Sequence, residues 1–455
     1  METSSSAPLS RIKPRIIIHG GAGNITRTNL TTTAYSAYRK ALLSILSNAS
    51  DLLNKPGSTA LDVATYAVSL LENEPLFNAG KGAVFTRAGT TELEASVMVT
   101  NGYRKRGVGC MLLQHVKNPI KLAREMLIRG ESLDGGGAQG HCQLAGHSAE
   151  RLAEEWGLEM VTPDYFYTQR RWDEHMKGLA LEKQRKTSNP TPIAQFNDPF
   201  PYMPAVETKK LGRENVDGDA HWNGKDYLPQ GTVGCVVLDS FGTICVATST
   251  GGLTNKLPGR IGDTPTLGAG YWAEEWFEEI LKPHSLRPQM LYQRSTSEHT
   301  LDKLSRGDFP SLISDCLPSS PRSTSPQIPT QSQHSNEKDT PPPLLRHAVG
   351  MSGTGNGDSF LRMAAVRTAA AVSRFSSPSL SLDIAVSLMA GPGGELQKSA
   401  GERWGVTGEG EGGIIGIELV ENEGKVVWDF NCGGMFKAWI DENGVGRCTV
   451  FKEEK

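Results

Sequence analysis

The sequence predicts a layered α/β sandwich. Short apolar runs typical of strands lie on both sides of Gly231, and segments with helical periodicity precede and follow these runs. This order of elements fits a layered sandwich more easily than a doubly wound nucleotide-binding sheet. With 455 residues, 38% of them hydrophobic, the chain can bury a substantial core.

Several elements upstream of Gly231 are predicted by the spacing of their apolar residues. They are strands at 15–18 and 93–99, the first ending in a glycine turn, and helices at 61–72, 119–128 and 148–156. Ser148 is typical of a helix N-cap and predicts the start of the last helix. Residues 183–227 are polar and rich in Pro, Asn, Gly and Asp, which predicts a mobile linker before Gly231.

The segment after Gly231 predicts a hairpin. Apolar runs at 232–239 and 243–250 are joined by a short turn around Phe241, and antiparallel pairing about that residue places Thr250 opposite Thr232. This arrangement suits cleavage between Gly231 and Thr232. A threonine freed in this way carries nucleophile and base together, since its α-amine can take the proton from its own hydroxyl. A Gly-Thr-Val-Gly strand start is common, so the facing threonine is needed to favour catalysis.

Composition excludes several functional classes. The net charge of −3 gives no global basic bias toward nucleic acid, and no run is long enough to span a bilayer. The first ten residues are polar and small, so we expect a cytoplasmic or nuclear location. Seven cysteines without a Cys-x-x-Cys pair argue against a disulfide scaffold or a zinc cluster. Cys235 and Cys245 lie in the apolar runs, where we expect them to be buried and reduced.

Several motifs resemble, in the same order, the plant-type asparaginase and isoaspartyl peptidase family of N-terminal nucleophile hydrolases. They are His-Gly-Gly-Ala-Gly at 19–23, Phe-Asn-Ala-Gly-Lys-Gly-Ala-Val-Phe-Thr-Arg at 77–87, Glu-Leu-Glu-Ala at 92–95, Gly-Thr-Val-Gly at 231–234, Thr-Ser-Thr-Gly-Gly at 248–252, Asn-Lys-Leu-Pro-Gly-Arg-Ile-Gly-Asp at 255–263, Ser-Gly-Thr-Gly-Asn-Gly-Asp at 352–358 and a weaker Phe-Asn-Cys-Gly-Gly-Met at 430–435. Together they are specific, although no single motif is.

The resemblance implies the four-layer αββα sandwich of those hydrolases and cleavage at Gly231. An α chain of residues 1–231 and a β chain of residues 232–455 would form one catalytic domain, since both contribute strands to one core. The resemblance also implies a homodimer of such cleaved units. The implied substrates are small amino acids or dipeptides, with no nucleic acid or membrane partner.

The motifs after Thr232 supply candidate site residues. Arg260 and Asp263 lie in one glycine-punctuated loop, and a guanidinium with a carboxylate suits the α-carboxylate and α-ammonium of an amino acid. The resemblance gives them these roles, and it makes the Thr354 hydroxyl and the Gly355 N–H the oxyanion donors at the head of a helix through 360–366. Thr250 would orient the nucleophile by hydrogen bond.

Other residues have supporting roles or competing interpretations. His19 closes an apolar strand, which favours support of the glycine turn over a role as base. Asn78 and the segment 92–94 could position the site or bind a structural alkali ion, as the family's ion-binding loop does; no catalytic cofactor or metal is expected. Where the family usually has aspartate, this chain has Glu94. The glycines at 353–357 lack the spacing of a dinucleotide-binding loop.

The chain departs from the family most clearly at an insertion of about 275–347. Residues 274–280, Glu-Glu-Trp-Phe-Glu-Glu-Ile, predict a helix that caps or extends the site. Residues 318–343 are dominated by Ser, Pro, Thr and Gln, which predicts disorder. Three functions remain open: hydrolysis of asparagine or β-aspartyl peptides, a related hydrolase resembling threonine aspartase or glycosylasparaginase, and an unprocessed scaffold without catalysis.

Overall fold

The computed structural model describes residues 12–188, 231–279 and 344–454. The chain divides into two units, residues 1–277 with 346–455, and residues 278–345. The first unit holds every predicted site residue. Most of the predicted linker at 183–227 and the predicted disordered segment at 318–343 lie outside the described residues.

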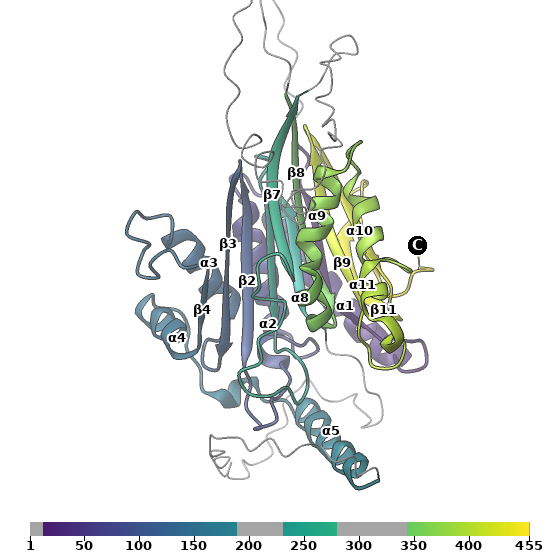
Figure 1. Ribbon diagram of the computed structural model, residues 1–455. Helices are drawn as coiled ribbons and strands as arrows, with labels where there is room; N and C mark the ends of the chain where they lie inside the picture. The colour runs from purple at the N-terminus through teal and green to yellow at the C-terminus, as the bar shows by residue number, and fades with distance from the viewer. Residues whose placement is uncertain (1–11, 189–230, 280–343, 455) are drawn as a thin grey trace, which may run out of the picture. The chain divides into compact units, whose positions relative to one another are not determined.

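Two β-sheets form the centre of the first unit (Figure 1). The larger has the order β12-β11-β1-β5-β6-β2-β3-β4, and the smaller has the order β10-β9-β8-β7. The larger sheet contains β1 (Arg15–Gly23), β2 (Leu93–Asn101), β3 (Arg104–Leu113), β4 (Gln143–Ala145), β5 (Val233–Leu238), β6 (Ile244–Thr250), β11 (Gly434–Ile440) and β12 (Gly446–Thr449). The smaller contains β7 (Tyr271–Glu279), β8 (Leu344–Gly355), β9 (Gly412–Val420) and β10 (Glu423–Phe430).

Helices cover the outer face of each sheet. Against the larger sheet pack α1 (Thr32–Leu53), α2 (Ala60–Asn73), α3 (Pro119–Arg129) and α4 (Gly146–Glu155), and α5 (Gln169–Ser188) follows α4. With the smaller sheet are α8 (Gly357–Met363), α9 (Ala365–Phe375), α10 (Leu382–Ala390) and α11 (Glu395–Ser399). None of the helices in the described ranges is long and apolar enough to cross a membrane.

The central strands are apolar on both faces because each face packs against a different layer. On β1, Ile16 and Ile18 belong to the core beneath α1–α3, whereas Ile17 belongs to the core between the sheets. Cys235 and Cys245 are buried free thiols, as predicted, and both lie in the core on the helix side of the larger sheet. The four-layer sandwich therefore follows from strands that the sequence makes apolar throughout.

Most predicted elements are confirmed. Strands cover 15–18 and 93–99, and helices cover 61–72, 119–128 and most of 148–156. The glycine turn predicted after residue 18 is wrong: β1 continues to Gly23, because its glycines pair with β11 after a register shift between His19 and Gly21. The hairpin has the predicted register, with Val233 opposite Ser249 and Leu238 opposite Ile244. The α4 helix begins earlier than predicted, at Gly146, and its N-cap is not a serine.

Two further local predictions are wrong. Residues 271–279 form β7 rather than a helix, because tertiary ion pairs allow glutamates to lie buried in a sheet: Glu274 is 1% exposed and bonds to Arg374 at 2.6 Å. The helix predicted through 360–366 is broken at Ala364, whose φ of 43° is left-handed. The segment instead forms α8 and α9.

Candidate active site

The predicted nucleophile, Thr232, directly precedes β5 and is buried. Thr232 is 7% exposed, and its Oγ1 lies 3.0 Å from Oγ1 of Thr264. The Thr250 hydroxyl instead accepts a hydrogen bond from the Gly252 N–H at 3.0 Å. Thr264 thus makes the contact that the sequence predicts for Thr250. Its position directly after Asp263, in the predicted binding loop, was the available signal.

The Gly231 backbone lies against two other parts of the predicted site. A Cβ on Gly231 would lie 2.5 Å from Gly21 Cα and 2.7 Å from Thr354 Oγ1, so no larger residue fits without movement. The buried Thr354 hydroxyl accepts from the Ala22 N–H at 3.3 Å, and Gly355 follows it at the end of β8. The structure therefore brings Thr354 beside the bond that would be cut.

His19 connects the two sheets close to this bond. Its Nε2 lies 2.7 Å from Ser352 Oγ, across a gap that exists because Gly234 has no side chain. Burial lowers the pKa of His19 to about 3, although the Thr232 backbone opposes this effect. The imidazole is therefore neutral at cellular pH, which does not suit a cationic role. The predicted support of a glycine turn is wrong, because His19 lies within β1 and contacts Ser352 of the other sheet instead.

Arg260 and Asp263 lie together, as predicted. Arg260 Nη2 donates to Asp358 Oδ2 at 3.1 Å, and a Cβ on Gly357 would lie within 2.5 Å of Asp263 Oδ1 and 2.9 Å of Arg260 Nη2. Burial raises the pKa of Asp263 to about 7, against the lowering effect of Arg260. Within the described ranges, Asp263 Oδ2 is buried without a hydrogen-bond partner. A buried carboxylate with a free oxygen can bind a cation such as an α-ammonium.

Residues at the start of β2 hold the 255–263 loop in place. Glu94 Oε1 accepts from the Gly262 N–H at 2.9 Å, and Glu92 Oε2 accepts from the Gly259 N–H at 2.9 Å. Lys256 Nζ donates to the Glu92 carbonyl at 2.8 Å. Burial raises the pKa of Glu94, and Lys256 opposes the shift. The Glu94 carboxylate therefore positions the loop through its backbone.

Asn78 joins two loops near the end of β6. Its Nδ2 donates to the Gly252 carbonyl at 2.7 Å, and its Oδ1 accepts from the Val84 N–H at 3.0 Å. These bonds favour the predicted supporting role. No group of three or more His, Cys, Asp or Glu side chains in the described part of the chain could hold a metal ion.

Comparison with known proteins decides the family. A family model described as Asparaginase matches residues 12–278, more than half of the chain. The chain belongs to the asparaginase family. The resemblance and the predicted αββα sandwich are thereby confirmed, and the chain is a hydrolase. Of the predicted site residues, Thr354 and Gly355 lie beyond the matched range.

Individual relatives agree with this assignment. The chain is 38% identical over 261 residues to an isoaspartyl peptidase of Escherichia coli K12, covering 57% of this chain and 68% of that protein. It is 35% identical over 267 residues to a putative isoaspartyl peptidase/L-asparaginase of Dictyostelium discoideum, covering 58% and 71%. A probable isoaspartyl peptidase/L-asparaginase 2 of Arabidopsis thaliana is also 35% identical, over 57% and 72%.

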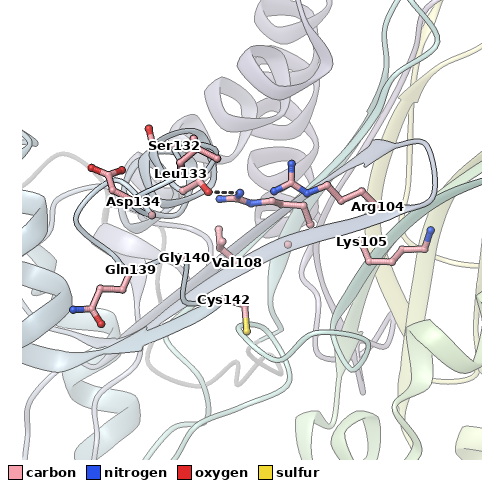
Figure 2. Close-up of a pocket in the computed structure, with 13 residues that line it drawn as sticks. Arg104, Lys105, Val108, Ser132, Leu133, Asp134, Gln139, Gly140 and Cys142 are labelled. Carbon is pink, nitrogen blue, oxygen red and sulfur yellow. Dashed lines mark hydrogen bonds between the residues drawn. The ribbon is translucent and has the colours of Figure 1, made fainter.

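A surface pocket of about 480 Å³ in this asparaginase-family chain lies elsewhere (Figure 2). It is bounded by the first residues of β3 and by the glycine-rich loop at 130–142. Arg104 and Arg106 both pair there with Glu131, at 2.6 and 2.7 Å. The pocket includes none of the predicted site residues.

A buried carboxyl beneath the site should make folding stability depend on pH. Glu72 Oε1 accepts from Ser249 Oγ at 2.7 Å and from the Ile120 N–H at 3.0 Å, and burial raises its pKa to about 7. In the unfolded chain a glutamate titrates near ~4.3. The unfolded state thus loses this proton first as pH rises, so the stability due to Glu72 should fall between about pH 4.3 and pH 7.

A Glu72→Gln variant cannot lose this proton, so its free energy of unfolding should decline less across that window. Across the window, the free energy of unfolding of the parent chain should fall by on the order of 3 kcal/mol more than that of the variant. Urea unfolding at pH 5, 6, 7 and 8 measures it. The exposed Glu154→Gln variant on α4 is the control and should follow the parent chain. Parallel curves for Glu72→Gln and parent would contradict the prediction.

Proposed function

We propose that the chain hydrolyses the side-chain amide of L-asparagine and the β-aspartyl bond of isoaspartyl peptides, with Thr232 as nucleophile. One observation carries the proposal. The Thr232 hydroxyl bonds to Thr264, so the adjacent Asp263 and the nearby Arg260 lie on the loop that touches the nucleophile. A group that can attack a carbonyl and a pair that can hold an amino-acid head therefore share one site.

The nucleophile is freed by cleavage of the chain itself. The Thr232 hydroxyl attacks the Gly231 carbonyl to form an ester in place of the peptide bond, and water hydrolyses the ester. Residues 1–231 and 232–455 then remain associated, because β5 of the second piece pairs with β1 of the first on one side. β11 pairs with β1 on the other side.

During turnover the freed α-amine serves as general base. Such a group titrates near ~7.7 to 8, so a sizeable fraction is neutral at cellular pH. The Thr232 hydroxyl attacks the substrate's side-chain carbonyl, and the Thr354 hydroxyl with the Gly355 N–H stabilises the resulting oxyanion. Arg260 holds the α-carboxylate and Asp263 holds the α-ammonium. Water then hydrolyses the aspartyl ester.

A paired peptide assay tests the substrate class. Purified protein is incubated with L-asparagine, with β-aspartyl-leucine and with α-aspartyl-leucine, and release of ammonia or leucine is measured. Hydrolysis of the first two without the third supports the proposal, because only these place the scissile carbonyl on the side chain. Inactivity on all three overturns it and favours a protein substrate, a glycosylated asparagine or a scaffold without catalysis.

A further inference from the structure

We propose that Thr264 positions the Thr232 hydroxyl for cleavage of the Gly231–Thr232 bond; this rests on the proposed function. The two hydroxyl oxygens lie 3.0 Å apart. Thr264 is fully buried and Thr232 is 7% exposed, so water competes poorly for this contact.

The backbone of Thr264 is itself fixed by two hydroxyls of the larger sheet. Ser96 Oγ on β2 donates to the Thr264 carbonyl at 2.6 Å, and Thr248 Oγ1 on β6 approaches the same oxygen at 3.3 Å. Ser96 and Thr248 are directly opposite in the ladder and also bond to each other. Two hydroxyl side chains of the larger sheet therefore hold Thr264 against the nucleophile.

Cleavage has a particular need for such positioning. Before cleavage the Thr232 nitrogen is part of a peptide bond and cannot act as base, so the direction of the hydroxyl matters more than in the freed enzyme. Threonine has three staggered χ1 rotamers, and a fixed partner for Oγ1 favours one of them. In the reaction Oγ1 bonds to the Gly231 carbonyl carbon, the carbon–nitrogen bond breaks, and the hydroxyl proton ends on the departing nitrogen.

A Thr264→Val variant removes the hydroxyl and keeps the branched shape. The full-length chain is synthesised in a cell-free system, and the fraction cut at Gly231 is followed over time by intact mass. We expect cleavage to be roughly 10- to 100-fold slower than in the parent chain, as for a misplaced reacting group. Thr264→Ser, which restores a hydroxyl, should recover most of the rate.

The matched control is Thr266→Val in the same loop. The Thr266 hydroxyl donates to the Gly262 carbonyl at 3.0 Å and has no bond to Thr232, so its loss should leave the cleavage rate within a few-fold. Thermal unfolding of each uncut chain shows whether the fold persists. If Thr264→Val fails to fold, Ser96→Ala loosens the same loop and should slow cleavage.

The outcomes separate the two proposals. A parent chain that stays whole overturns the proposed self-cleavage and with it the basis of this inference. A parent chain that cuts itself while Thr264→Val cuts at the same rate, or faster, overturns the role of Thr264 alone. Equal slowing in Thr264→Val and Thr266→Val would also overturn it, because loop packing would then explain the effect.

Discussion

A Thr232→Ala chain is expected to remain uncut and to lose hydrolysis of L-asparagine by at least roughly 10⁴-fold. Alanine has no hydroxyl to attack the Gly231 carbonyl, so neither the ester nor the free α-amine forms. Intact mass after incubation at neutral pH measures the first effect. The parent chain should give two pieces, the second beginning at Thr232.

Two further variants sharpen this result. Thr232→Ser keeps a hydroxyl and should cut itself, more slowly because serine is less restrained at χ1. Thr243→Ala changes a threonine at the other end of the hairpin and should cut as the parent does. Full activity in uncut Thr232→Ala protein would show that another group performs the attack.

The sequence predicts the layers and much of the site because short-range patterns determine them. Apolar runs on both sides of Gly231 specify strands buried on two faces, and the short turn fixes the register from Val233 opposite Ser249 onward. Arg260 and Asp263 are close in sequence, so one loop keeps them close in space. These features need no knowledge of distant contacts.

The partner of the nucleophile could not be predicted in the same way. Extending the register beyond the ladder places Thr250 opposite Thr232. However, Thr232 lies outside β5, and the Thr250 hydroxyl accepts from the Gly252 N–H at 3.0 Å instead. Thr264 reaches Thr232 only because the loop after β6 folds back over the sheet. That path depends on tertiary contacts, which a local pattern does not contain.

The helix predicted for the glutamate-rich segment at 274–280 was wrong for a related reason. Glutamates usually favour exposed helices over buried strands. In the structure Glu274 faces Arg374 at 2.6 Å and Arg367 at 3.6 Å, both from α9. These arginines are distant in sequence, so the pattern around Glu274 gives no sign that its charge would be neutralised within the fold.

Asp263→Asn is expected to lower kcat/KM for L-asparagine by roughly 10²- to 10³-fold while chain cleavage continues. Asparagine has nearly the same shape, so the loop and its Thr264 contact should persist. It carries no charge, and the Asp263 carboxyl is 4% exposed, where an uncompensated α-ammonium would be costly. Steady-state ammonia release measures the loss.

Succinamic acid, which is asparagine without its α-amine, identifies the cause. If Asp263 recognises the α-ammonium, the parent and Asp263→Asn enzymes should differ only a few-fold with succinamic acid. This substrate has no α-ammonium for either enzyme to bind.

The pH profile gives an independent check. Burial raises the pKa of Asp263 to about 7, so in the parent enzyme kcat/KM for L-asparagine should fall as pH drops below 7 and the carboxylate protonates. Asp263→Asn should lose this dependence and keep only that of the Thr232 α-amine. An equal loss on both substrates, with an unchanged pH profile, would instead assign Asp263 a purely structural role.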